Sequence, residues 1–586
     1  MHLLHSLTVM PLAQAGTERW LTLWASPFFL VGVGILAGLV LLALFIALMR
    51  LLTNVRAWES LSRGPAGHIV AAVITALIAG GLWYLITRQA FTGPEENLER
   101  VLIFVAVLML SAIVGWGLVF CAERKSAVTL LATLGEGASS VLVVVALVVM
   151  AIGLLSGFVF PDPQSALTSV PRLFQTGTQE HVQVIPGTPS TVNADEAPLV
   201  PFKLDVDAKL LDALTISTDR TVVLGDAPES GQFIQAPKRL QADEQISWSR
   251  KDEKDPPIPI GDQQRALHIQ NREVDDATVT ITTLTKPAVP EASTILVTAA
   301  IVFLTGIAIL LQQAVAPRAS AVALATIKNE LAQPLFVVLI ALGTFLIILF
   351  EFLSFYTFGE DIKLLKECGI VVIMLLAAFQ GIWSASSSIS EEIEGRTALT
   401  VLSKPIQRRS FVLGKFLGIF WIVTLLFVIL GAIELGAVAY KPIYEARENS
   451  MELPAWQECH REMVATVPGL VLGLMQATLL STFSVALATR LPQLANIAIC
   501  FGMYVVGHLA TAIVSGANEG FPIVKFVAQL VATVTPILEH FSMQAAIDAG
   551  SPIPMSLLSG TLIYCVLYIM LSMFLALLLF EDRDLA

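Results

Sequence analysis

The residues best suited to chemistry lie in one charged segment, SEEIEGRTALTVLSKPIQRRS, residues 390–410. An apolar run precedes this segment and another follows it, so its charge is concentrated on one short connection. Ser390 is of a type that caps helix starts. Glu391, Glu392 and Glu394 then fall in the first turn, where the helix dipole favours anions. The segment therefore predicts a short amphipathic helix with a mixed-charge polar face.

Residue types also set the charge pairing and the end of this predicted helix. Glu392 and Arg396 are four residues apart, in the order that favours an ion pair on one helix face. Pro405 disfavours helical geometry at Lys404, so the helix should end there. Two interpretations remain open: an ordinary solvated loop with the positive charge typical of cytoplasmic loops, or a docking surface for a cytoplasmic partner. Only the second accounts for the acidic residues beside the basic ones.

The rest of the chain offers no catalytic constellation. No GxxxxGK[ST] motif occurs, and LGKF at 413–416 lacks both the upstream glycine and the Ser or Thr of a phosphate-binding loop. HExxH, GxSxG and paired metal-ligand motifs are also absent from the sequence. We therefore expect no catalytic residue, no metal site and no cofactor on this chain. The net charge of −12 argues against a nucleic-acid partner.

Composition indicates what positions the charged segment. The 586 residues are 55% hydrophobic and only 14% charged, which is typical of a polytopic membrane protein. A membrane-spanning helix needs about 20 mostly apolar residues. Eleven stretches meet this length, at 27–50, 68–88, 101–120, 139–160, 294–315, 334–354, 369–389, 411–438, 468–489, 494–515 and 556–580.

Residues 161–292 form a different kind of sequence, rich in Pro, Asp and Thr. Apolar and polar residues alternate in VPFKLDVD and in ATVTITTLT, a period of two that is typical of half-buried strands. The predicted fold class is therefore an all-α polytopic membrane protein with a β-rich insert.

Lys and Arg set the expected orientation, because cytoplasmic loops carry an excess of both. With a cytoplasmic C-terminus, the inner loops collect thirteen such residues and the outer short segments nine. The chain is thus expected to be a multi-pass protein of the plasma (inner) membrane, with residues 161–292 on the extracytoplasmic side.

The stretch EEIEGRTALTVLSKPIQRRSFVLGKFLG closely resembles the cytoplasmic loop of ABC-2 type permeases, the membrane subunits of type-2 ATP-binding-cassette transporters. The resemblance covers roughly residues 320–586. ALATIKNELAQP is similar to the family's interfacial connecting helix, with Leu324, Ile327 and Leu331 as its apolar stripe and Lys328 and Glu330 off that stripe. Six predicted spans follow, which is the family's number. The tail LFEDRDL resembles that of the copper-site maturation and gliding-associated permeases.

The resemblance implies that this loop couples the membrane helices to a separate ATPase subunit, which would hold ATP and Mg. The residues that match the family's coupling loop are Glu391, Glu392, Glu394, Gly395, Arg396, Thr397, Leu402, Ser403, Lys404 and Pro405. Arg408 and Arg409 are expected to anchor to anionic lipid headgroups. The positions of the predicted spans divide the chain into a four-span N-terminal membrane region at 1–160, the β-rich domain at 161–292 and a fifth span at 293–316, and the resemblance makes 317–586 the permease core with six spans.

Polar residues within the predicted spans are candidates for a transport pathway, because such residues are costly in a bilayer. Glu434 is expected either to reach the headgroups or to act as a gate or cargo contact near the exit. Glu351 is expected at the outer interface. For Gln380, Gln476 and His508 we expect hydrogen bonds between helices rather than a proton relay or a metal site. We nevertheless retain Glu434, Gln476 and His508 as pathway candidates.

Three functions follow. The first is the permease subunit of an ATP-driven exporter that acts as a homo- or heterodimer of permease chains. The second is a mechanotransmitter, in which an ATPase drives the 161–292 domain to act on an envelope protein. The third is a membrane scaffold or sensor without an ATPase, whose outer domain binds a ligand. The resemblance does not extend to residues 1–316, so it assigns that half no role.

Overall fold

A computed structural model describes most of the chain. The described residues are 19–52, 65–90, 97–121, 135, 137–173, 176–189, 197–202, 210–225, 237–242, 244–250, 267–353, 361–391, 407–517, 523, 525–526, 529–530, 535–550 and 553–581. The chain divides into two compact units. One, the helical unit, consists of Met1–Phe160 together with Val297–Ala586, and the other, the β-rich unit, is Pro161–Leu296.

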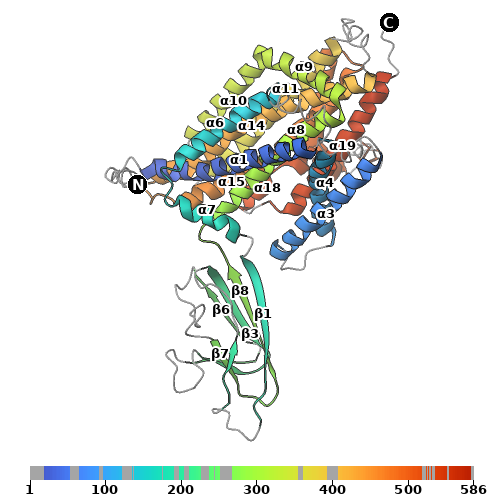
Figure 1. Cartoon of the computed structure of the whole chain (residues 1–586). Helices are drawn as coiled ribbons and strands as arrows, with labels where there is room; N and C mark the ends of the chain where they lie inside the picture. Colours follow the sequence, from blue (N-terminus) through green and yellow to red (C-terminus); the bar gives the residue numbers. More distant parts are fainter. Residues whose placement is uncertain are drawn as a thin grey trace. The chain divides into compact units, whose positions relative to one another are not determined.

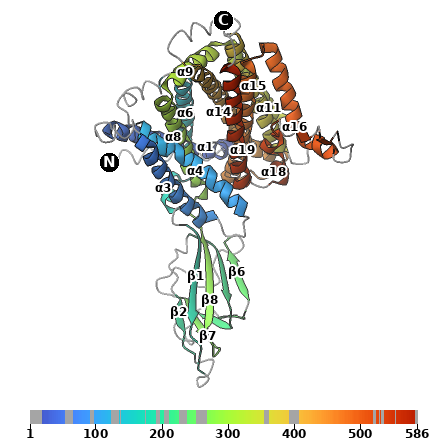
Figure 2. The ribbon, with the colours of Figure 1, turned by 90° about the vertical axis from the view of Figure 1, so that its right-hand side faces the viewer.

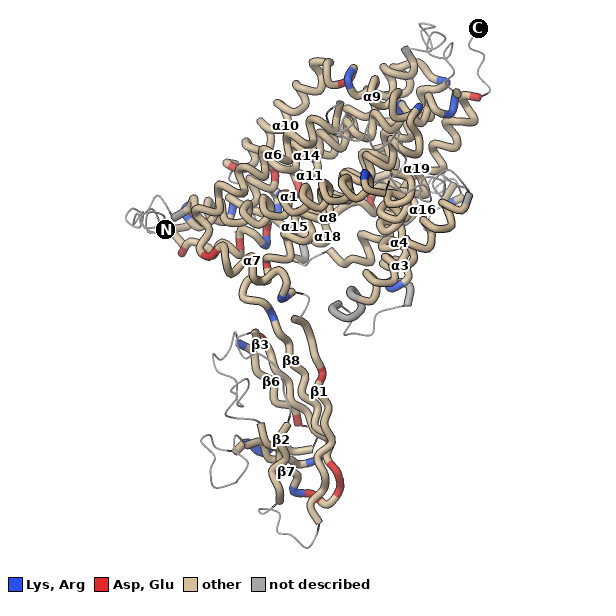
Figure 3. The backbone as a smooth tube through the Cα atoms, viewed as in Figure 1, with Lys and Arg blue, Asp and Glu red and all other residues tan. Residues whose placement is uncertain are grey.

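The helical unit is built from long apolar helices (Figure 1). The bounds of its helices are α1 (Arg19–Leu52), α3 (Pro65–Ala90), α4 (Asn97–Phe120), α6 (Ala138–Ser156), α8 (Ser293–Val315), α9 (Pro317–Ala332), α10 (Pro334–Phe352), α11 (Asp361–Ala385), η3 (Ser386–Glu391), α14 (Arg408–Glu448), α15 (Trp456–Ala488), α16 (Gln493–Ala517), η4 (Leu538–Phe541), α18 (Gln544–Ala549) and α19 (Met555–Glu581). Most of the long helices carry few Lys, Arg, Asp or Glu residues (Figure 3). This composition suits a hydrocarbon environment.

Ten helices in the described part of the chain are long and apolar enough to cross a membrane. They are α1, α3, α4, α6, α8, α10, α14, α15, α16 and α19, and each coincides with one of the eleven predicted spans. The remaining predicted span, 369–389, is also helical, because α11 occupies Asp361–Ala385, but it is not among the ten. A multi-pass membrane protein with a β-rich region is therefore confirmed, with ten candidate spans in place of eleven.

Helix α14 lies at the centre of the helical unit. It packs against α9, α11 and α15, and residues such as Ile422, Leu425 and Leu426 are fully buried there. The N-terminal helices belong to the same unit, since α1 packs against α6, α14 and α15, and α4 packs against α19 (Figures 1 and 2). The indole of Trp24 on α1 donates a hydrogen bond of 3.0 Å to the carbonyl oxygen of Gly436 on α14. The first 160 residues thus help to enclose α14 and α15.

Two glycines allow α9 to approach α14 closely. A Cβ atom added at Gly414 would lie 2.6 Å from the carbonyl oxygen of Ala319, and one at Gly418 would lie 2.8 Å from Cβ of Thr326. Small residues four apart on one face let membrane helices approach in this way. The Gly414/Gly418 pair therefore serves contact within the chain.

The β-rich unit is a sandwich of two antiparallel sheets, with strand orders β1-β8-β3-β6 and β2-β7-β4-β5 (Figure 1). The elements of this unit are α7 (Pro163–Arg172), β1 (Gly177–Ile185), β2 (Val200–Phe202), β3 (Leu211–Thr218), β4 (Val222–Gly225), β5 (Lys238–Leu240), β6 (Gln245–Ser249), β7 (Leu267–Asn271), β8 (Ala277–Thr285) and η2 (Pro290–Ala292). In β8 every second residue is buried, which is the alternation that the sequence predicts. Ile216, Ile269 and Ile281 are among the fully buried residues of its core.

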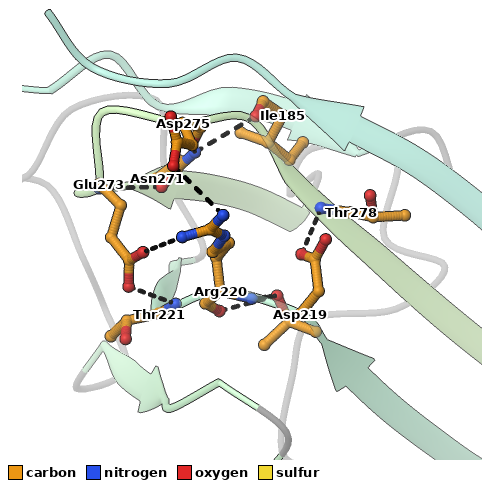
Figure 4. A network of polar contacts seen from close by, with 9 residues as sticks. Ile185, Asp219, Arg220, Thr221, Asn271, Glu273, Asp275 and Thr278 are labelled. Atoms are coloured by element: carbon orange, nitrogen blue, oxygen red, sulfur yellow. Dashed lines mark hydrogen bonds and ion pairs between the residues drawn. The ribbon is translucent and has the colours of Figure 1, made fainter.

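A polar network fixes one end of this sandwich (Figure 4). Arg220, in the turn between β3 and β4, pairs with Glu273 at 3.5 Å and Asp275 at 3.2 Å. Glu273 also accepts a hydrogen bond of 3.0 Å from the backbone N–H of Thr221. This bond, followed by the contact with Arg220, lowers the pKa of the Glu273 carboxyl. The network joins the β3–β4 turn to the β7–β8 turn, each of which connects one sheet to the other.

Candidate functional site

Of the predicted coupling segment, residues 391–405, the structure describes only the first residue. Glu391 ends η3, a π-helix that continues directly from α11. The other nine coupling residues lie outside the described residues, namely Glu392, Glu394, Gly395, Arg396, Thr397, Leu402, Ser403, Lys404 and Pro405. Their role as a docking surface stays a prediction. What the structure describes is the attachment of the segment to the helices on either side.

Ser390 has a different role from the one that the sequence predicts. It lies within η3, and its hydroxyl donates to the carbonyl oxygens of Ala488, at 3.3 Å, and Leu491, at 2.9 Å. The prediction of a helix cap at Ser390 is therefore wrong. Those two carbonyls belong to the end of α15 and the turn after it, so the start of the coupling segment is bonded to α15.

A buried polar cluster lies just before η3. Glu330 on α9 is fully buried, and its carboxylate accepts hydrogen bonds from Gln380, at 3.2 Å, and from the hydroxyl of Ser384, both on α11. Gln380 also donates to Ser384 at 2.9 Å. We call these three residues the Glu330 cluster. The sequence placed Glu330 off the apolar stripe of α9 but did not predict that it is buried against polar partners on α11.

A second set of hydrogen bonds lies around η3 itself. The amide of Asn496 on α16 donates to the hydroxyl of Ser386 at 2.8 Å and to the hydroxyl of Ser484 on α15 at 2.9 Å. All three side chains are buried. Sequence reasoning missed this set because single Ser and Asn residues in apolar helices carry no recognisable motif. The signal that could have found them is the clustering of hydroxyls in SASSSIS, directly before the charged segment.

Arg408 and Arg409 are exposed at the start of α14. The guanidinium of Arg408 donates to the carbonyl oxygen of Glu581 at 2.9 Å, and Arg490 donates to that of Leu579 at 2.8 Å. Cations stabilise helix C-termini in this way. A cavity of about 380 Å³ lies here, lined by Gln407, Arg408, Arg409, Leu577, Phe580 and Glu581. The structure thus describes a contact between Arg408 and the end of α19, and the headgroup contact of Arg408 and Arg409 stays a prediction.

Glu434 is fully buried on α14 and does not reach the surface of the helical unit. Its carboxyl group packs against Gly369 of α11, where a Cβ atom would overlap it. Glu351, next to the last residue of α10, is also buried, and its expected position at the outer interface stays a prediction. Within the described part of the chain neither carboxyl has a hydrogen-bond partner, although Lys441 donates at 3.0 Å to the backbone oxygen of Glu351. Unpartnered carboxyls at such positions are expensive and therefore remain candidates for function.

Gln476 on α15 and His508 on α16 are brought together. Nε2 of the amide lies 2.8 Å from Nε2 of the imidazole, and the ring of Tyr504 packs edge-on against that imidazole at 4.7 Å between centroids. The expected hydrogen bond between helices is confirmed. Glu434 instead lies against α11, so the three pathway candidates occupy two separate polar positions. Among the described residues no group of three or more His, Cys, Asp or Glu could hold a metal ion.

The long apolar helices with a few satisfied polar clusters between them define a multi-pass integral membrane protein. The profile of a known family, described as ABC-2 family transporter protein, matches residues 286–585, and the chain belongs to this family. It is therefore the membrane subunit of an ABC transporter, a permease rather than the ATPase, and permeases of this family pair with an ABC ATPase subunit. The match begins just after β8 and spans η2 and α8 to α19, so α1 to α7 and all the strands of the β-rich unit lie outside it. A comparison with curated proteins finds no match.

Proposed function

We propose that the chain is the permease of an exporter and that a separate ATPase chain drives it through residues 391–405. The observation that carries this proposal is the attachment of the coupling segment. Its first residues form η3, which is hydrogen-bonded to α15 and α16 and directly follows the Glu330 cluster on α9 and α11. A force applied at the segment would therefore reach four helices through directional bonds rather than through a solvated loop.

In this proposal the ATPase binds ATP and Mg, and two permease chains, identical or related, line the pathway. The C-terminus is cytoplasmic, the protein lies in the plasma membrane, and the β-rich unit is extracytoplasmic. Alternating access would follow from nucleotide-driven movement of α11 relative to α14 and α15. Glu434 and the Gln476–His508 pair then offer polar contacts along the helices that move.

The test is purification of the tagged full-length chain in mild detergent, followed by mass spectrometry of the proteins that accompany it. We expect a P-loop ATPase in stoichiometric amount, and its loss on Glu394→Lys or Arg396→Glu. Glu452→Lys is the matched control, because Glu452 is exposed and lies far from the segment in the sequence. If wild-type protein brings no ATPase under conditions that preserve known complexes, the scaffold or sensor function replaces this proposal.

One observation favours the mechanotransmitter as a second candidate. The β-rich unit has its own hydrophobic core and its own polar network, so it is built as a separate body that an envelope protein could engage. Deletion of residues 165–288 distinguishes the two functions. A mechanotransmitter would lose all function while ATP hydrolysis persists, whereas an exporter would retain part of its transport or change its cargo.

A further inference from the structure

The Glu330 cluster stands out because a buried carboxyl group joins the end of α9 to α11, whereas many other buried residues of α9 are apolar or small. Along α9 the buried side chains include Val322, Ala323 and Ile327, which pack without directional bonds. Glu330, one turn before the end of α9, instead has three hydrogen bonds, from Gln380, from Ser384 and, at 3.4 Å, from Gln333. A carboxylate is a stronger acceptor than a neutral group, and such a bond is strengthened further where water is excluded. Glu330 therefore fixes the register of α9 against α11.

The Glu330 cluster lies next to η3 along α11, so a movement of η3 would act directly on the cluster. Ser384 is the second-last residue of α11, and η3 begins at Ser386. A π-helix is rare and is found mostly as a short insertion at functional sites, because its geometry is less favourable than that of an α-helix. A segment that can return to α-helical geometry is a two-state element. A conformational change in η3 would shift the end of α11. Gln380 and Ser384, the α11 partners of Glu330, would shift with it.

A separate set of hydrogen bonds joins η3 to α15 and α16. Asn496 holds Ser386, and Ser390 donates to the end of α15, so η3 is bonded at both ends to α15 and α16. Without the Glu330 cluster these contacts would still hold the start of the coupling segment in place. The cluster is therefore the described polar connection that passes a change in η3 on to α9.

We propose that Glu330 is a positioning residue for energy coupling, which ties α9 to the end of α11 so that the two move as one element when the ATPase acts on the coupling segment. The inference rests on the proposed function, since it takes the ATPase as the source of the movement. It adds a named residue outside the coupling segment and assigns α9 an active part rather than that of an interfacial anchor. Because Glu330 is fully buried between helices, the role proposed for it is to position α9.

The experiment compares hydrogen–deuterium exchange of the full-length chain, co-purified with its ATPase, with and without Mg-ATP and vanadate. In wild-type protein we expect nucleotide to change the exchange of η3 and of α9 together. In Glu330→Gln and Ser384→Ala we expect η3 to respond as before, whereas the response of α9 falls about fivefold, the effect of losing one buried hydrogen bond. Thr482→Val is the control, because Thr482 is equally buried but its hydroxyl bonds only within α15.

The outcomes separate this inference from the proposed function. A purely structural role for Glu330 would raise the exchange of α9 equally with and without nucleotide, and that result would overturn the inference. So would an α9 response in both variants that equals the wild-type response. If wild-type protein carries no ATPase at all, the proposed function fails and the inference fails with it. If Glu330→Gln does not fold, Ser384→Ala alone decides, because it removes one hydroxyl and leaves the carboxylate in place.

Discussion

Two glutamates of this chain are equally buried, yet replacing them with methionine should change stability in opposite directions. Glu330 and Glu434 are both fully buried. The carboxylate of Glu330 accepts three hydrogen bonds, whereas within the described chain neither oxygen of Glu434 has a partner. Methionine is unbranched like glutamate, so it can follow the same path and still fit against Gly369.

The magnitudes follow from the partners. An unsatisfied polar group that is buried costs about 1–3 kcal/mol, so Glu434→Met should raise the free energy of unfolding by about 2 kcal/mol. Glu330→Met removes a charged acceptor and leaves the amide of Gln380 and the hydroxyl of Ser384 without it. Glu330→Met should therefore lower the free energy of unfolding by about 2–4 kcal/mol. The two variants should therefore differ by roughly 5 kcal/mol, although neither changes the length of the side chain much.

Tryptophan fluorescence during heating, in one detergent and at one pH, measures the difference. Unfolding entropy is about 2.1 cal/mol/K per residue, so for a chain of 586 residues about 1 kcal/mol shifts Tm by about 1 °C. We therefore expect Glu434→Met about 2 °C above wild type and Glu330→Met about 2–4 °C below it. The reasoning is refuted if Glu434→Met destabilises as much as Glu330→Met, since Glu434 would then have a stabilising partner. A stabilised Glu434→Met that also loses ATP-driven activity would mark Glu434 as a residue retained for function, because functional sites often reduce stability.

Three further predictions concern packing, a helix contact and pH. Gly381→Ala should lower the free energy of unfolding by about 1–3 kcal/mol, because its Cβ would overlap the hydroxyl of Ser481 on α15. Adding Ser481→Gly should restore Tm. Gly80→Ala is the control, because nothing lies within 4 Å of a Cβ at that position. A double-mutant cycle of Gln476→Leu and His508→Leu should give a coupling free energy of about 0.6 kcal/mol, and a value near zero would contradict the hydrogen bond. Glu273→Gln should weaken amide protection in the turns around Arg220 at neutral pH. Because folding lowers the pKa of Glu273 below its ordinary 4.5, this stabilisation is present above pH 4.5 and is lost as the pH falls through the lowered pKa, so the difference in exchange between variant and wild type should shrink on acidification.

The long helices and the strand alternation could be predicted because both depend on local composition. A run of about 20 apolar residues, or a period of two, is visible in the sequence whatever lies around it. The surroundings of single polar residues could not be predicted in the same way. The sequence placed Glu330 off the apolar stripe of its helix, Ser390 at a helix cap and Glu434 at the headgroups or an exit, and it did not reveal that all three side chains are buried. Which side chain faces a buried glutamate depends on how two helices cross, and one sequence does not contain that information.

The family profile does not cover the N-terminal half, and here too the structure shows contacts between helices that the sequence does not reveal. In sequence, residues 1–160 are apolar helices without motifs, and nothing assigns them to the permease. In the structure Gly32 of α1 and Gly153 of α6 meet so closely that a Cβ at Gly32 would lie 2.7 Å from Cα of Gly153. The indole of Trp24 then bonds to α14, the helix that also contacts α9 and carries Glu434. Because α1 packs against both α14 and α15, any movement of those two helices in a transport cycle must move α1 or break this contact. Helices α1 and α6 thus pack in the same unit as the family-matched helices, even though no motif identifies them.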